Sequence, residues 1–334
     1  FFSSHNVSFG IEALMDDLTN HSITATGAPE YTFDATQKTF AVFLQDQWNI
    51  TEDWTLTLGL RQSWISTSLD YFEEDPDREN SSSDSSLVGN IGLVYTGFEN
   101  FAIRAQYSQG FRAPPLASQF TGTGLYLRPN NNLKPEKSQN YELGVRYSGS
   151  NLTLDSSVFY NEIDDVMTTR VIGYIPNTTW SVNETINAAT YTSYGWELDA
   201  AWNIPGTDFT PYGNVSLMKT RLEHETYTTR ANRVPKAWGT IGLKWDRQMD
   251  EQSRLFANFS YRMSSPYKYD GGDGEIWYRH KGGKTADLTV GFELGTEQKF
   301  KATLTIKNMF NKEFEPDYYY YPGMHAVLGV SYEF

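Results

Sequence analysis

The chain has 334 residues, and its 27 lysines and arginines against 41 aspartates and glutamates give a formal net charge of −14. This acidic balance argues against nucleic acid or an anionic lipid surface as an electrostatic partner. Cysteine is absent, which excludes disulfides and thiolate metal sites. The five histidines show no paired spacing of the kind a zinc enzyme needs (His5, His21, His224, His280 and His325).

Hydropathy alone suggests a soluble protein, because the mean hydropathy is −0.53 and there is no apolar run of the roughly 18 residues that a membrane helix needs. A transmembrane β-barrel escapes this test, since its lipid-facing residues occupy only alternate positions. The chain opens with "FFSSHNVSFG", without a methionine or a basic signal region. We therefore expect either that a signal was removed or that the sequence begins at a cut.

Period-two alternation runs through most of the chain. In "DWTLTLGLRQSW" (residues 53–64) large apolar side chains alternate with threonine, glycine, arginine and serine, and "FAIRAQY" (101–107) and "KATLTIKN" (301–308) repeat the pattern. Such segments predict strands with one apolar and one polar face. Aromatic residues stand at the ends of the apolar face and basic residues in the middle of the polar face, which favours an aromatic-girdled barrel over a soluble sandwich.

The alternation predicts fourteen strands. In chain order they are 5–14, 37–48, 53–65, 87–96, 99–109, 139–147, 151–161, 190–203, 208–220, 236–246, 252–263, 283–294, 298–309 and 324–334. The connections alternate between short turns and long loops (15–36, 66–86, 110–138, 162–189, 221–235, 264–282 and 310–323). Outer-membrane barrels have this rhythm, so we predict an all-β, antiparallel transmembrane barrel with long loops outside the cell and the C-terminus in the periplasm.

Four motifs in order then resemble TonB-dependent outer-membrane receptors. They are "YSQGFRAPPLASQF" (107–120), "NNNLKPEKSQNYELGVRY" (130–147), "SVFYNEIDDVM" (157–167) with "YGWELDAAW" (194–202), and "IKNMFNKEFEP" (306–316) with a later Pro-Gly. The terminal Phe334 on an amphipathic strand is similar to the assembly signal of such barrels.

The resemblance implies a barrel of about 22 strands with a plugged lumen. Residues 1–334 would then be the C-terminal portion of the barrel domain, without the N-terminal plug and the first strands. The implied function is active import of an iron chelate, without enzymatic chemistry. The implied partners are the TonB complex, acting through the plug, together with outer-membrane lipid and lipopolysaccharide; we expect a monomer and no nucleic acid. A passive porin is the alternative of a different class.

A ferric siderophore is the first expected ligand and haem the second. Haem receptors of the family place a histidine between FRAP (111–114) and the asparagine-rich box, but residues 115–129 contain no histidine, although Tyr126 is a possible phenolate ligand. Candidate ligand-binding residues are aromatic or basic, as chelate recognition requires. They are Phe111, Arg112, Tyr126, Arg128, Trp277, Tyr278, Arg279, His280, Tyr318, Tyr319, Tyr320 and Tyr321. For each tyrosine, an interface anchor is the competing interpretation.

No intrinsic cofactor is expected. Oxygen-rich loops leave calcium open, with Asp270, Asp273 and Glu275 as candidate ligands in "DGGDGE", although their spacing is not that of an EF-hand. An enzyme is not expected, since the sequence has no GxSxG, HExxH or P-loop motif.

Overall fold

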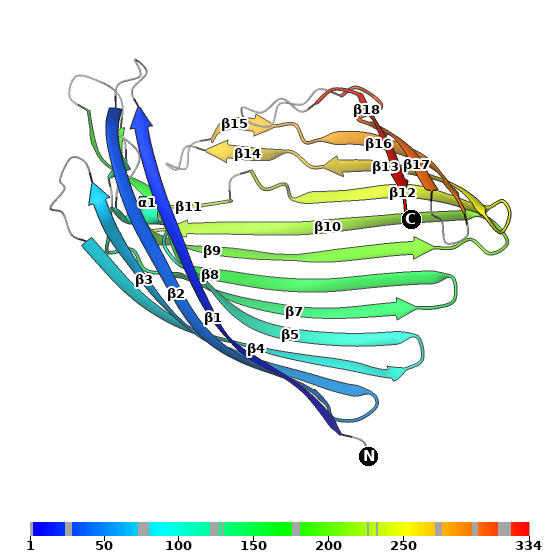
Figure 1. Ribbon diagram of the computed structural model, residues 1–334, viewed down its shortest axis with the longest axis horizontal. Coiled ribbons are helices and arrows are strands. Elements are labelled where there is room, and N and C mark those ends of the chain that lie inside the picture. Colours follow the sequence, from blue (N-terminus) through cyan, green and yellow to red (C-terminus); the bar gives the residue numbers. More distant parts are fainter. Residues whose placement is uncertain are drawn as a thin grey trace.

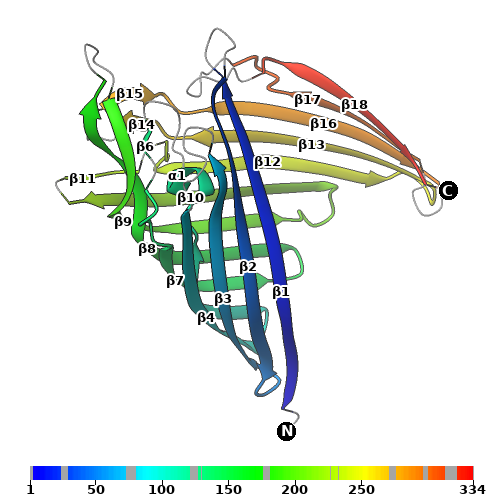
Figure 2. The same ribbon diagram turned by 60° about the vertical axis from the view of Figure 1, so that its left-hand side comes forward.

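The computed structural model describes residues 3–23, 29–72, 80–120, 127–128, 130–175, 181–225, 227–231, 233–270, 276–295, 300–312 and 322–333. They form a 16-stranded, almost wholly antiparallel sheet in which each strand of the main path lies beside the next (Figure 1). The sheet curves into an open trough (Figure 2). Within the described residues β1 and β18 are its two edges and do not pair with each other, so the sheet is not closed.

The main path contains fourteen of these strands. They are β1 (Ser4–Ile23), β2 (Pro29–Asn49), β3 (Trp54–Phe72), β4 (Asn80–Phe98), β5 (Phe101–Arg112), β7 (Glu136–Ser148), β8 (Leu152–Tyr174), β9 (Ser181–Trp202), β10 (Phe209–His224), β12 (Ala237–Gln248), β13 (Ser253–Ser264), β16 (Lys284–Leu294), β17 (Phe300–Lys307) and β18 (His325–Tyr332). Two short strands extend it, β6 (Leu127–Arg128) beside β9 and β11 (Thr228–Thr229) beside β10.

Two further elements lie outside this sheet. β14 (Tyr267–Asp270) and β15 (Ile276–His280) form a separate hairpin, and α1 (Leu116–Phe120) is a single short helix. In the described part of the chain, no helix has the length and hydrophobicity needed to cross a membrane.

All fourteen predicted strands are present, in the predicted order, and the antiparallel β-fold is confirmed. The predicted loops were too long, however. Most of 15–36, 66–86 and 162–189 continues as strand, because β1–β4, β8 and β9 extend well beyond their apolar segments. The start of β4, "NSSSDSS", is polar on both faces, and the apolar residues in the extensions of β2 and β3, such as Phe33 and Leu69, lie on the concave face and pack against α1. The extensions therefore do not continue the lipid-facing alternation of hydropathy. The prediction also missed α1 and the short strands β6, β11, β14 and β15.

The two faces of the sheet differ as the alternation requires. On β3, Trp64 is exposed, whereas its neighbours Ser63 and Ile65 are buried. The buried set faces the hollow of the trough, because α1 lies in that hollow and packs there (Figure 2). The opposite, convex face carries most of the exposed large apolar side chains, as a surface in contact with lipid would.

Aromatic residues mark two levels on the convex face. Near the short turns, Trp54 of β3 lies against Tyr95 of β4 with ring centroids 4.5 Å apart. Nearer the long connections, four tyrosines stand directly opposite one another on four consecutive strands, β5, β7, β8 and β9 (Tyr107, Tyr141, Tyr160 and Tyr194). Rows of this kind are typical of the aromatic girdles at the two membrane interfaces.

The concave face is polar, and many of its charges are paired across strands. Arg104 of β5 donates from Nε to Glu142 at 3.0 Å and from a terminal nitrogen to Asp155 at 2.9 Å, so it joins β5, β7 and β8. Further cross-strand pairs on this face are Arg61–Glu12, Arg254 with Asp246 and Glu293, Lys301–Glu293, and Arg262–Asp287. Where these ion pairs form, the concave face is hydrophilic but carries little net charge.

Glycine allows one of these pairs to form. Gly144 stands opposite Arg104, and a Cβ atom at this position would lie 2.4 Å from Cζ of Arg104. The guanidinium therefore passes over the glycine on its way to Asp155.

We predict that Gly144→Ala destabilises the barrel by about 1–3 kcal/mol, because the new methyl group displaces Arg104 from both carboxylates. The measurement is the temperature at which the folded form loses its fast electrophoretic mobility. Gly92→Ala is the matched control, since a Cβ there meets nothing closer than 3.8 Å. Equal midpoints for the two variants would contradict the assignment.

Candidate functional site

The described part of the segment between β5 and β7, which contains α1, folds into the trough. Leu116 and Phe120 of α1 pack against Phe33, Ala35 and Leu69 on the concave face of β2 and β3. Beside this apolar cluster, Thr67 Oγ1 donates to Gln119 Oε1 at 3.2 Å, and Gln119 Nε2 donates to the Pro114 carbonyl at 2.9 Å. The segment is thus a fixed part of the inner wall at the long-connection end.

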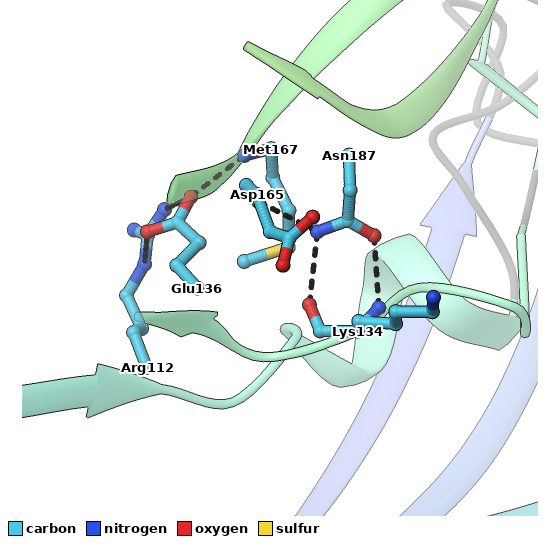
Figure 3. Close-up of polar contacts among 6 residues, drawn as sticks. All are labelled: Arg112, Lys134, Glu136, Asp165, Met167 and Asn187. Carbon is cyan, nitrogen blue, oxygen red and sulfur yellow. Dashed lines mark hydrogen bonds and ion pairs between the residues drawn. The ribbon is translucent and has the colours of Figure 1, made fainter. Parts of the chain in front are cut away.

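An ion pair anchors the segment at both of its ends. Arg112, the last residue of β5, donates from Nε and a terminal nitrogen to the two Glu136 oxygens at 2.9 and 2.7 Å (Figure 3). Glu136 begins β7 and is buried, and it also accepts the backbone N–H of Met167 at 2.7 Å. A forked pair of this geometry fixes orientation as well as distance. The arginine of FRAP and the glutamate of LKPE are therefore partners.

A second set of hydrogen bonds ties the segment to β8 and β9. Asn187 donates to the carbonyls of Lys134 and Asp165 at 2.9 and 2.7 Å and accepts the Lys134 N–H at 2.8 Å (Figure 3). Asp165 has a φ of 56°, and the register between β8 and β9 shifts between Ile163 and Val166. Such a bulge re-aims backbone groups, which here allows the Asp165 carbonyl to meet Asn187. We call the contacts of Arg112, Glu136, Met167, Asn187, Lys134 and Asp165 the clamp.

A cavity of about 540 Å³ opens beside the clamp. Its lining comes from four neighbouring strands and includes Phe111 and Arg112 of β5, Glu136 and Ser138 of β7, Ile163 and Val166 of β8, and Tyr191 of β9. Tyr191 stands opposite Ile163 and is on the concave face, half-buried. The cavity thus combines a guanidinium, a carboxylate, a phenol and two aliphatic walls, a mixture suited to an amphiphilic ligand of moderate size.

The two predicted ligand-binding residues of the FRAP motif, Phe111 and Arg112, lie on opposite faces of the sheet. Arg112 is on the concave face, while Phe111 shares the convex face with Phe101 and Tyr107, because adjacent strand residues point in opposite directions. Arg128 in β6 stands opposite Glu184 of β9, and these two strands run parallel. Its side chain is exposed.

The candidates of the EIWYRH segment lie in β15. His280 is buried, stacks on Tyr267 with ring centroids 4.5 Å apart, and accepts the Gly282 N–H at Nδ1. It packs within the protein instead of facing a ligand space. Trp277, Tyr278 and Arg279 precede it on the same strand, and their side chains are outside the described part of the structure, as is that of Asp270 at the end of β14.

The other predicted residues are outside the described residues altogether. They are Tyr126, Tyr318, Tyr319, Tyr320, Tyr321, Asp273 and Glu275. Among the residues that are described, no group of three or more histidine, aspartate or glutamate side chains is placed to hold a metal ion.

Sequence reasoning missed Glu136, Asn187 and Tyr191. Glu136 follows Lys134-Pro135 in a recognised motif, so a charge partner for Arg112 was available in the sequence. Nothing in the sequence placed Asn187 or Tyr191 beside it. Asn187 comes from a stretch predicted as loop, and Tyr191, in the predicted strand 190–203, has no local signal for its neighbours across the sheet.

Comparison with known proteins shows which proteins this chain resembles. A family model described as TonB dependent receptor-like, beta-barrel matches residues 3–309. The pesticin receptor of Yersinia pestis is 25% identical over 304 residues, covering 89% of this chain and 42% of that protein. The ferric aerobactin receptor of Klebsiella pneumoniae is 25% identical over 376 residues, covering 99% and 47%. The chain thus spans about half the length of these relatives.

Solved structures share the fold at low identity. The copper transporter OprC superposes with a TM-score of 0.80 at 14% identity, over 99% of this chain and 54% of that one. The ferric yersiniabactin uptake receptor FyuA from Yersinia pestis gives a TM-score of 0.70 at 20% identity, over 98% and 49%. In both cases the open sheet corresponds to about half of the other chain.

We predict that Glu136→Ala loosens the inward-folded segment, because Arg112 and the Met167 N–H both lose their acceptor. The expected cost is about 1.5–3 kcal/mol, the usual range for hydrogen bonds to a charged group. Amide hydrogen exchange at residues 130–136 and 165–167 should become faster. Glu162→Ala, which removes a convex-face acceptor of Tyr160, is the matched control. Unchanged exchange at 130–136 in the Glu136 variant would show that the clamp does not anchor the segment.

Proposed function

The chain belongs to the family of TonB-dependent receptor-like β-barrels, and we propose that it forms part of a receptor that imports a ferric siderophore. Members of this family are transport receptors of the outer membrane and not enzymes. The match over residues 3–309 is the observation that carries the proposal. The names of two similar proteins, a ferric aerobactin receptor and a ferric yersiniabactin receptor, support the choice of ligand class.

The open sheet supports a further part of the proposal. We propose that residues 1–334 are the C-terminal portion of a larger barrel, whose other strands pair with the edges of β1 and β18. A plug domain elsewhere in the receptor would contact the TonB complex. Both suggestions agree with coverage of about half of each relative.

The long-connection end is the proposed outer side. There the cavity beside the clamp would receive the chelate, with the Tyr191 ring offering a stacking surface. Arg128, which is exposed, would offset the negative charge that many ferric chelates carry. The role of Arg112 is chiefly structural, because its guanidinium is already paired with Glu136 and fixes the segment between β5 and β7. We leave His280 out of this site because it is buried against Tyr267. Phe111 is among the residues that line the cavity, although its place in β5 puts its side chain on the convex face.

No covalent step is proposed, because the chelator itself satisfies the iron. The protein binds, orients and releases. The paired charges of the concave face suit this role: a wall of unpaired cations would retain an anionic chelate, whereas paired ones leave a hydrated path.

The function is tested by expressing the complete receptor in bacteria that lack other ferric siderophore receptors. We predict uptake of radioactive iron from a ferric siderophore when TonB is present and loss of uptake when it is deleted. Uptake that is independent of TonB would contradict the proposal. A stoichiometric Soret shift with haemin would favour haem, and a large steady conductance in a planar bilayer would favour a porin.

We predict that Tyr191→Ala weakens ferric siderophore binding by roughly tenfold, the equivalent of about 1.4 kcal/mol of lost stacking, while Tyr191→Phe keeps most of the affinity. Tyr194→Ala is the matched control, since Tyr194 is on the same strand but on the convex face. Binding can be followed by quenching of the receptor's tryptophan fluorescence. Equal affinities for the two alanine variants would remove Tyr191 from the site.

A further inference from the structure

The cavity beside the clamp carries two opposite charges that cancel. Among the described residues of its lining, only Arg112 and Glu136 are charged at neutral pH; the others are a glycine, a serine, a tyrosine and three apolar residues. Glu136 is buried, whereas the Arg112 side chain keeps 63% of its surface exposed. The cavity therefore presents a guanidinium to a ligand while its net charge is zero.

The guanidinium of Arg112 has donors that the ion pair does not use. Arginine offers five N–H donors, and Nε and one terminal nitrogen of Arg112 each donate to Glu136, at 2.9 and 2.7 Å. Within the described part of the chain, no group accepts a hydrogen bond from the other terminal nitrogen. Its two N–H groups can donate to neutral acceptors on a ligand, such as carbonyl oxygens.

Charged residues adjacent to the lining leave this balance unchanged. Lys137 and Asp164 stand opposite each other on β7 and β8, and Lys137 shares the convex face with Phe111, which stands opposite it on β5. In the clamp, Lys134 and Asp165 again contribute one positive and one negative charge. Each basic residue here is matched by an acidic one.

Arg128 lies nearer the long-connection end than the cavity does. It stands opposite Glu184 of β9, which is 191 − 184 = 7 residues from Tyr191, or roughly 23 Å along a strand. Glu184 also forms an ion pair with Arg170 at 2.8 Å, so these three residues together carry a single net positive charge. Because the Debye length at physiological salt is about 8 Å, this charge attracts an approaching anion but contributes little at the cavity.

A strongly anionic chelate would therefore find no counter-charge in the cavity. Moving such an ion from water into a partly apolar space costs free energy of desolvation, which only an opposite charge offsets. The carboxylate of Glu136 adds repulsion, and the Met167 N–H helps to hold it in place behind the guanidinium. A chelate with little net charge avoids both costs.

We infer that this cavity selects ferric chelates of low net charge, such as trihydroxamates, over strongly anionic ones, such as tris-catecholates. Three hydroxamates cancel the charge of ferric iron, whereas three catecholates leave the complex triply negative. The unused N–H groups of Arg112 meet oxygens of the chelate, and Ile163, Val166 and Tyr191 contact its carbon framework. The inference rests on the proposed function, in which the cavity receives a ferric siderophore, and it makes Glu136 the specificity-determining residue.

The test uses the complete receptor and four probes. Ferrichrome and ferrioxamine E are neutral trihydroxamates, and ferric aerobactin and ferric enterobactin are anionic; binding is followed by quenching of tryptophan fluorescence. We expect the wild type to bind the better neutral probe about tenfold more tightly than the better anionic one. Glu136→Gln keeps a hydrogen-bonding side chain of the same size but leaves the guanidinium uncompensated. We therefore expect the ratio of affinities to shift toward the anionic probes by roughly tenfold.

Two further variants separate charge from packing. Glu162→Gln removes the same charge from the convex face, where Glu162 accepts from Tyr160, and should keep the wild-type ratio. The double variant Arg112→Gln/Glu136→Gln restores a net charge of zero in the cavity, so the preference for neutral chelates should return. A ratio that stays shifted in the double variant would mean that a loosened clamp changed the selectivity, and it would overturn the inference.

Tighter binding of an anionic probe by the wild type, or equal ratios for Glu136→Gln and Glu162→Gln, would also overturn the inference while leaving siderophore import standing. Binding of none of the four probes would instead contradict the proposed function itself. The two failures are therefore distinguishable.

Discussion

Backbone hydrogen bonding within hydrocarbon is the constraint on which the rest of this structure depends. An unpaired N–H or C=O group in lipid costs several kcal/mol, so every membrane-spanning strand must be paired on both sides. Each of the fourteen strands of the main path forms its backbone hydrogen bonds with the strands before and after it along this path. Short turns at one end of the sheet allow such neighbours to lie side by side. Among the described strands of this path, β1 and β18 are the two with a single neighbour, and these two edges are where the proposed remainder of the barrel would join.

In the paired strands, successive side chains point to opposite faces of the sheet, so the molecule has two chemically different surfaces. The convex face carries apolar residues between two aromatic levels, and the concave face carries paired charges. The same division decides the roles of neighbouring motif residues. Arg112 faces the hollow and holds the clamp, while Phe111, one position earlier, faces the convex side.

The strands could be predicted from the sequence wherever one face meets lipid. In β7 the alternation of Tyr141, Leu143, Val145 and Tyr147 with polar residues is enough to place the strand. Prediction from this alternation fails where the sheet extends beyond the membrane into water and both of its faces are polar. For this reason the starts of β4 and β9 were predicted as loops.

The site was less predictable, because it depends on contacts between distant segments. Arg112 and Glu136 are 24 residues apart, and Asn187 reaches Lys134 across 53 residues through a bulge in β8. No local pattern encodes such a bulge. The burial of His280 was equally hidden, since its stacking on Tyr267 depends on a hairpin, β14–β15, that has no clear alternation.

The division into a lipid face and a lumen face can be measured directly on β7. The chain has no native cysteine, so single cysteines at positions 142, 143, 145 and 146 of the complete receptor can carry nitroxide labels without background. The account predicts that labels at Leu143 and Val145 respond to oxygen dissolved in lipid, and that labels at Glu142 and Arg146 respond to a water-soluble nickel chelate. Equal accessibility at all four positions, or the opposite phase, would contradict it.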